Sequence, residues 1–99
     1  MNANQFKFQA KIWLYPGKAG WYFITIPNKL VDDINLYSHK KRGWGSLRVV
    51  VKIKNYSWET SIFPDKKSGS YLLPIKASAR QSLQIGEGDT VKIEMAITN

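Results

Sequence analysis

Gly20-Trp21-Tyr22-Phe23-Ile24-Thr25-Ile26 decides the fold, because a similar stretch recurs 49 positions later as Gly69-Ser70-Tyr71-Leu72-Leu73-Pro74-Ile75. Just before it, Leu14-Tyr15-Pro16-Gly17-Lys18 recurs 48 positions later as Ile62-Phe63-Pro64-Asp65-Lys66. The helix-like stretches that follow keep the offset of 49 in the pairs Leu30/Ala79, Ile34/Leu83 and Leu36/Ile85. The sequence therefore predicts one supersecondary unit that is used twice.

The first copy is expected to contain two strands, a short helix and a third strand. Over residues 6–15, apolar residues alternate with the others, which is the period of a strand with one buried face. Pro16-Gly17 ends this strand, and a second strand is expected over residues 21–26. Pro27 suits the first turn of a helix over residues 28–37, with Leu30, Val31 and Ile34 buried. Alternation returns over residues 47–54 and predicts the third strand.

The second copy is expected to follow the same plan. Strands are predicted near residues 57–63, 71–75 and 90–97, with turns at 55–56 and 64–67 and a helix near 78–84. Gly86-Glu87-Gly88-Asp89 predicts a tight turn before the last strand, because glycine adopts positive φ and an aspartate side chain bonds nearby backbone.

Two such units predict a mainly β protein: a small pseudo-twofold double-split β-barrel of about six strands with two short helices. Neither half has enough apolar surface to close a core alone, and a closed barrel leaves no exposed strand edge. An open six-stranded sheet and a doubly wound α/β sheet are disfavoured. One domain is expected over residues 1–99, with halves at about 6–54 and 57–97 and flexible residues at 1–5.

Composition restricts the class of protein. The chain has 99 residues, a formal net charge of +8 and no cysteine. The absence of cysteine excludes disulfides and thiolate ligands and is compatible with a reducing cytoplasm, which is the expected location. The sequence contains no signal-like start and no apolar run of the roughly 18 residues that a membrane helix needs.

Two resemblances rest on particular residues. The order Ile26-Pro27-x-x-Leu30, its echo Leu73-Pro74-Ile75-Lys76, and Gly88-Asp89-x-Val91 resemble the swapped-hairpin element of AbrB-type transcription factors. A second set of motifs extends over residues 6–97: Phe6-x-Phe8-x-Ala10, Ile24-x-Ile26-Pro27, Thr60-Ser61-Ile62, Leu72-x-Pro74-Ile75-Lys76, Arg80 and Gly88-Asp89. In these motifs the chain resembles more closely a bacterial family of unknown function, made of small double-split barrels that are sometimes joined to a YdeI/OmpD-associated module. This resemblance implies a duplicated barrel in one chain, and hence a monomer, whereas AbrB-type proteins build theirs from two chains. It implies no catalytic residue.

The cations form the main candidate binding surface. A loop insertion carries Lys40, Lys41, Arg42 and Trp44, and the outward side of the third strand carries Arg48, Lys52 and Lys54. Lysine and arginine neutralise phosphates and tryptophan stacks on unpaired bases, so these residues predict a site for nucleic acid or another polyanion. A merely solvated face is the competing interpretation. Lys76 and Arg80, four positions apart, either bind an anion or flank the barrel.

The aromatic residues suggest a second function. Tyr22/Tyr71 and Tyr15/Phe63 recur between the copies, which favours a place in the core or at the barrel rim. The tryptophans have no tryptophan counterpart, and Trp13 shares a strand side with Lys7 and Lys11. Trp13 either packs against the facing half or lies exposed next to these two cations, as in a partner-binding or stacking surface. A protein-interaction or accessory module is therefore the alternative to nucleic-acid binding.

Catalysis is not expected. His39, the single histidine, lies among the loop cations, and the side chains of Asp32 and Asp33 would point about 100° apart on a helix. The other acidic residues lack the spacing of metal ligands. We therefore expect a non-enzymatic binding module without metal or cofactor.

Overall fold

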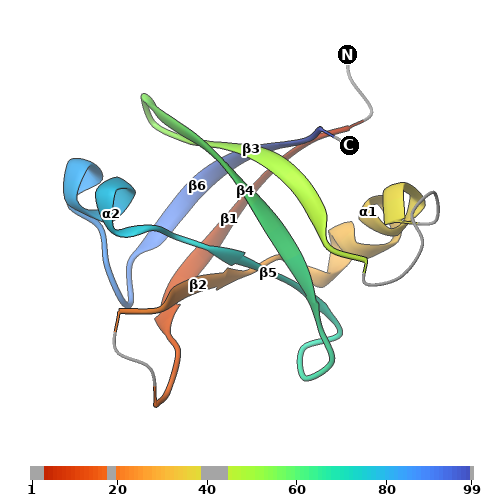
Figure 1. Cartoon of the computed structure of the whole chain (residues 1–99), viewed down its shortest axis with the longest axis horizontal. Coiled ribbons are helices and arrows are strands. Elements are labelled where there is room, and N and C mark those ends of the chain that lie inside the picture. The colour runs from red at the N-terminus through yellow and green to blue at the C-terminus, as the bar shows by residue number, and fades with distance from the viewer. Residues whose placement is uncertain (1–3, 18–19, 39–44, 99) are drawn as a thin grey trace.

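The computed structural model describes residues 4–17, 20–38 and 45–98. These residues form a closed antiparallel barrel in the order β1-β2-β5-β4-β3-β6. The strands are β1 (Gln5–Leu14), β2 (Tyr22–Thr25), β3 (Leu47–Ile53), β4 (Tyr56–Asp65), β5 (Ser70–Pro74) and β6 (Thr90–Ile97). A 3-10 turn, η1 (Asn28–Leu30), leads into α1 (Val31–Ser38), and α2 (Ala77–Leu83) lies on the opposite side of the barrel (Figure 1). The predicted fold class is confirmed.

The strand order has the pseudo-twofold form that a duplicated unit requires. The β1–β2 hairpin corresponds to the β4–β5 hairpin, and the two hairpins meet where β2 pairs with β5. The third strand of each half pairs with the first strand of the other half, because β3 lies beside β4 and β6 lies beside β1. Exchanging the strands of the two halves therefore leaves the strand order unchanged, and each half completes the sheet of the other half.

Matched tyrosines connect the halves. The amide of Ile26 donates to the carbonyl of Tyr71 at 3.0 Å, and the amide of Ile75 donates to the carbonyl of Tyr22 at 2.9 Å. The hydroxyl of Tyr71 donates to Oδ1 of Asn35 on α1 at 2.6 Å. On the other side, the guanidinium carbon of Arg80 on α2 lies 3.8 Å from the ring centre of Tyr22. Each tyrosine thus contacts the helix of the opposite half.

The first strands of the two copies align differently from the sequence prediction. Phe8, Ala10 and Ile12 correspond in pairing and burial to Trp58, Thr60 and Ile62, 50 positions later rather than 48. The hairpin pairings support the offset of 50, because the cross-strand pair Trp13–Phe23 of β1 and β2 corresponds to the pair Phe63–Leu72 of β4 and β5. The Pro16 and Pro64 motifs that suggested 48 are therefore not equivalent, since Pro16 follows β1 whereas Pro64 lies inside β4.

The barrel interior is filled by inward residues of all six strands. Ile24 and Leu73, directly paired between β2 and β5, are each 0% exposed. Ile34 of α1 and Ala79 of α2 complete this core from the two helices. Leu36, which the repeat aligns with Ile85, lies outside the core, because 64% of it is exposed.

Several boundaries differ from those predicted, each for a local reason. β4 continues to Asp65, and its turn follows at residues 66–69, where the Asp65 carboxylate accepts hydrogen bonds from the amide and hydroxyl of Ser68. The turn between β3 and β4 is Lys54-Asn55, since Ile53 pairs with Tyr56.

Other expectations agree with the structure. The turn at Gly86–Asp89 is confirmed: Gly88 has φ of +90°, and the Asp89 carboxylate accepts a hydrogen bond from the amide of Gly86 at 2.8 Å. Residues 4 and 5, which were expected to be flexible, are instead tied to the barrel: the side-chain amide of Asn4 donates to the carbonyl of Ile97 at 2.7 Å, and Gln5 belongs to β1. Within the described ranges, no helix is both long and apolar enough to cross a membrane.

Candidate functional site

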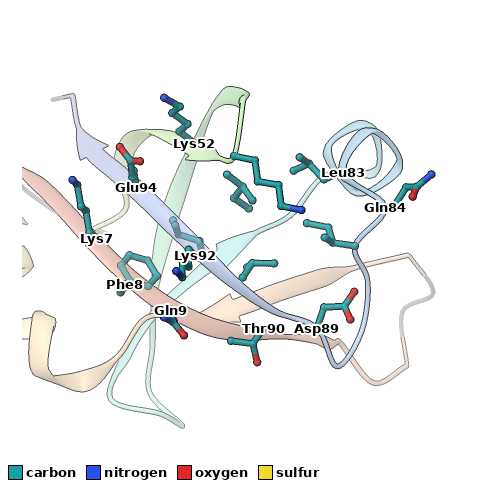
Figure 2. A pocket seen from close by; sticks show the side chains of 15 residues that line it. Lys7, Phe8, Gln9, Lys52, Leu83, Gln84, Asp89, Thr90, Lys92 and Glu94 are labelled. Atoms are coloured by element: carbon teal, nitrogen blue, oxygen red, sulfur yellow. The ribbon is translucent and has the colours of Figure 1, made fainter.

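Lysines gather on the outer side of the sheet formed by β1, β6 and β3. We call the set Lys7, Lys52, Lys54 and Lys92 the lysine face. These residues line a hollow of about 830 Å³. Figure 2 shows Lys7, Glu94 and Lys52 projecting from neighbouring strands, with Lys92 on the same strand as Glu94. Cations from three strands therefore share one concave surface.

The register of the sheet explains this convergence. On β6, the buried Val91, Ile93 and Met95 alternate with outward residues, so Lys92 and Glu94 point away from the core. Glu94 lies directly opposite both Lys7 on β1 and Lys52 on β3. Directly opposed residues have Cβ atoms about 4.5–5.5 Å apart. One carboxylate is thus flanked by two lysines, and lysines exceed carboxylates on the lining.

Leu83, Gln84 and Ile85, at the end of α2, form the wall of the hollow. Gln84 caps α2 in the left-handed conformation, with φ of 55°. Lys54, which also lines the hollow, has φ of 55° as well. These two are the only non-glycine residues with positive φ within the described ranges. In a two-residue hairpin turn, a residue with positive φ is normally glycine, so the backbone of Lys54 is strained.

The predicted polyanion site is only partly assembled on this surface. Lys52 and Lys54 belong to the lysine face. Arg48 lies toward β4, where it is 3.6 Å from the Glu59 carboxylate and donates to the Ser61 hydroxyl at 3.3 Å. Lys40, Lys41, Arg42 and Trp44 lie outside the described residues.

Sequence reasoning missed Lys7 and Lys92. Both are exposed lysines at outward positions of strands that alternation had located. The missing information was the pairing of β6 with both β1 and β3, which places Lys7 and Lys52 on either side of Glu94 and close to Lys92. That pairing follows from the exchange of third strands between the halves.

Lys76 and Arg80 lie at the start of α2, but Arg80 already has structural contacts. Its Nε donates to the carbonyl of Ile75 at 3.2 Å, and its guanidinium stacks on Tyr22. Lys76 is exposed. The anion site on this pair remains a prediction, and the contacts of Arg80 favour the alternative in which it flanks and fastens the barrel.

Aromatic side chains occupy the outer side of the β1–β2 hairpin. We call the set Trp13, Tyr15, Trp21 and Phe23 the aromatic surface. Adjacent ring centres lie 5.5–6.3 Å apart. The exposed fractions are 52% for Trp21 and 41% for Tyr15.

The predictions for these aromatics had mixed outcomes. Trp13 is partly buried and contacts its own hairpin: its ring lies 5.5 Å from that of Phe23, and its Nε1 donates to the Thr25 hydroxyl at 3.0 Å. Tyr15 and Phe63, expected in the core or at the barrel rim, lie outside the core, because they are 41% and 46% exposed. Tyr71 is buried and Tyr22 is half-buried, as the core or rim expectation required.

Residues 8–95 match the domain of unknown function DUF1905. The chain belongs to this family. The expected membership in a family of unknown function is thereby confirmed, over a range close to the residues that carried the resemblance. Curated proteins show no match to the chain.

The acidic residues of this DUF1905 chain form no metal centre within the described ranges, where no three potential ligands among His, Asp and Glu lie together. Asp32 and Asp33 are exposed in the first turn of α1. Carboxylates at that end of a helix interact favourably with its dipole, which is a sufficient structural reason for them. His39 lies outside the described residues.

Proposed function

We propose that this protein is a non-enzymatic module that binds polyanions, nucleic acids above all, through the lysine face. The convergence of Lys7, Lys52 and Lys92 from three adjacent strands is the observation that carries the proposal. Clustered cations release the counterions condensed on a phosphate backbone, which provides sequence-independent affinity. The net charge of +8 adds long-range attraction for the same partners.

The closed barrel weakens one competing explanation for the lysines. Strands at a sheet edge often carry lysine to prevent pairing with another molecule. Lys52 is paired on both sides, with Ser57 of β4 and Glu94 of β6, so it does not lie at an edge. Lys7 and Lys92 are each paired on one side, with Glu94 and Gln9 respectively. Protection of an edge therefore does not account for Lys52, and its place beside the other lysines favours ligand binding.

Further features extend the proposal. Lys40, Lys41, Arg42 and Trp44 enter the chain between α1 and β3, and we propose that they add to the same polyanion site. The resemblance to AbrB-type barrels supports nucleic-acid binding by analogy, which is a weak warrant on its own. We also propose a monomer in the cytoplasm, since one chain supplies both halves of the barrel and contains no cysteine.

A salt titration tests this proposal. Affinities for a fluorescent oligonucleotide and for heparin would be measured from about 50 mM salt upward, for the wild type and for the variant K7A/K52A/K92A. Each lost phosphate contact lowers the log-log slope by about 0.7 to 0.9, so the triple variant should lose about two to three. The control K29A/K66A/K67A removes as many cations from outside the lysine face. Absence of wild-type binding to either polyanion, or equal losses in both variants, would contradict the proposal.

A protein-interaction module is the second candidate. It is favoured by a hollow of about 570 Å³ beside the aromatic surface, lined by apolar side chains from β2, β4 and β5. Exposed aromatic groups of this kind are enriched at protein interfaces. Capture of a specific protein that is lost with Trp21→Ala but retained in K7A/K52A/K92A would support this candidate.

A further inference from the structure

The aromatic surface is not required to close the barrel. Ile12 and Ile24, inward neighbours of these aromatics on β1 and β2, are 1% and 0% exposed and belong to the core. The aromatic residues lie on the opposite side of the same strands, with Trp21 and Tyr15 largely exposed. Large exposed apolar groups that cluster on a surface typically mark a binding site.

The duplication supplies an internal control for this surface. At the corresponding positions of the β4–β5 hairpin, Tyr15 is replaced by Asp65 and Trp21 by Ser70. The second hairpin forms the same pairing without these aromatics. The hairpin geometry therefore does not demand them, and a function specific to the first hairpin explains them better.

A continuous row along β1 joins the aromatic surface to the lysine face. Lys7, Gln9, Lys11, Trp13 and Tyr15 occupy successive outward positions. The amide of Tyr15 donates to the carbonyl of Trp21 at 2.8 Å, so pairing continues one step beyond β1. At about 3.3 Å per residue, the row spans up to about 26 Å. A flexible polymer could therefore contact cations at one end and aromatic rings at the other.

The hollow beside the aromatic surface has the chemistry of a base-stacking platform. Trp21, Phe23 and Phe63 are among its lining residues, together with Tyr22, Leu72 and Pro74. Its lining contains one lysine, Lys76, and no carboxylate. Flat rings with a nearby cation and no acidic group favour an unpaired nucleic-acid strand, because bases stack on aromatic faces while phosphates contact cations.

We infer that the protein prefers single-stranded nucleic acid, which runs along the outer side of β1 with its phosphates on the lysine face and its bases on the aromatic surface. This inference rests on the proposed polyanion binding and adds the class of strand. Bases in a duplex are stacked on one another and cannot lie flat on these rings. The expected site is short, toward the lower end of the roughly 4–16 nucleotides that OB-fold barrels bind.

The test compares three probes: a single-stranded oligonucleotide, the duplex of the same sequence, and heparin. In the variant Y15A/W21A, single-strand affinity should fall tenfold or more, as expected for loss of one or more stacked bases. Affinities for duplex and heparin, and the salt slope for heparin, should stay unchanged. Single strands should also quench tryptophan fluorescence in the wild type, whereas heparin should not.

Two controls keep the result interpretable. Leu36→Ala removes an exposed apolar side chain from α1, at 64% exposure, and should leave all three affinities unchanged. Trp21→Phe retains an aromatic face and should preserve most of the single-strand preference even if Y15A/W21A is poorly folded. Thermal unfolding would verify the fold of each variant.

The outcomes separate this inference from the proposed function. If the wild type binds heparin and both oligonucleotides but Y15A/W21A keeps the same single-strand affinity, the stacking inference is overturned and the polyanion proposal stands. If a protein ligand competes for the aromatic surface while single strands do not, the inference is likewise overturned. If the wild type binds none of the three probes, the polyanion proposal itself fails.

Discussion

The β1–β2 and β4–β5 hairpins share a backbone plan but differ in their outward side chains. Inward, Ile24 of β2 pairs directly with Leu73 of β5, and both are fully buried. Outward, the first hairpin carries the exposed Trp21, whereas the corresponding Ser70 is buried and donates to the carbonyl of Ile26 at 2.6 Å. The two hairpins are therefore alike at their directly paired core positions, and they differ at the position of Trp21 and Ser70, which is exposed in the first hairpin and buried in the second.

This difference separates the constraints on the fold from those on function. Inward positions of both halves fill one closely packed space, so a change of volume in either half is felt by the other. Outward side chains do not have to fill a shared space, so the differences between the two halves at these positions reflect interactions with molecules outside the barrel. The same reasoning applies to the lysine face, where Lys52 and Glu94, of opposite charge, are paired across the equivalent strands β3 and β6.

The largest expected effect tests the shared core. Ile24→Ala and Leu73→Ala should each lower the free energy of unfolding by about 2–5 kcal/mol, because a large buried side chain is lost and a cavity remains. Similar shifts in chemical denaturation are expected, since the two residues face each other between equivalent strands. Leu36→Ala is the control, with an expected change within about 0.5 kcal/mol. A large loss for one core variant and none for the other would contradict the shared core.

Much of the fold follows from sequence pattern alone. Strict alternation located the first and third strands of the first copy, and the echo of residues 20–26 in residues 69–75 identified the second strand of each half. The offset between the first strands of the two copies was harder to predict, because the Pro16 and Pro64 motifs look alike in sequence but lie at different places in the fold. Pro64 fits within β4, whereas Pro16 follows β1. Only strand pairing distinguishes these cases.

The candidate site was less predictable, because it depends on contacts between distant residues. Lys52 and Lys54 were identifiable as outward cations of one strand, but their neighbours Lys7 and Lys92 come from both ends of the chain. The aromatic surface combines Tyr15, which sequence reasoning placed in the core or at the barrel rim, with Trp13, Trp21 and Phe23. Tyr15 and Phe63 point outward. Neither periodicity nor composition shows whether the barrel interior still has room for such large side chains.

The contacts between the halves provide the second test. Arg80→Met should lower the free energy of unfolding by about 1–2 kcal/mol, because it removes the stacking on Tyr22 and the hydrogen bond to Ile75. Polyanion affinity should change little if Arg80 only fastens α2 to the barrel. Lys76→Met is the companion variant, with little effect on stability. A marked loss of phosphate or heparin affinity in both variants would instead support an anion site on this pair.

A smaller effect of opposite sign is expected on the lysine face. Glu94→Gln removes the carboxylate that lies between Lys7 and Lys52 and repels a phosphate. Affinity for heparin or an oligonucleotide should rise about two- to fivefold at low salt, equivalent to roughly 0.4–1 kcal/mol for an exposed charge. The gain should vanish at high salt. Glu59→Gln, next to Arg48, is the control outside the hollow, and an equal gain there would indicate a general effect of net charge.

The smallest effect concerns Lys54, a lysine in a backbone conformation that favours glycine. The left-handed conformation costs a non-glycine residue about 1 kcal/mol or slightly more, whereas glycine loses more backbone entropy on folding. Lys54→Gly should therefore leave the free energy of unfolding unchanged or raise it by less than about 1 kcal/mol. If the strain is retained because the ammonium group contacts a polyanion, the same substitution should lower the salt slope by about 0.7. Gln84→Gly relieves an equal φ of 55° at another residue that lines the hollow, without removing a charge, so its salt slope should not change. An unchanged slope in Lys54→Gly would remove Lys54 from the binding surface and leave its conformation without a functional reason.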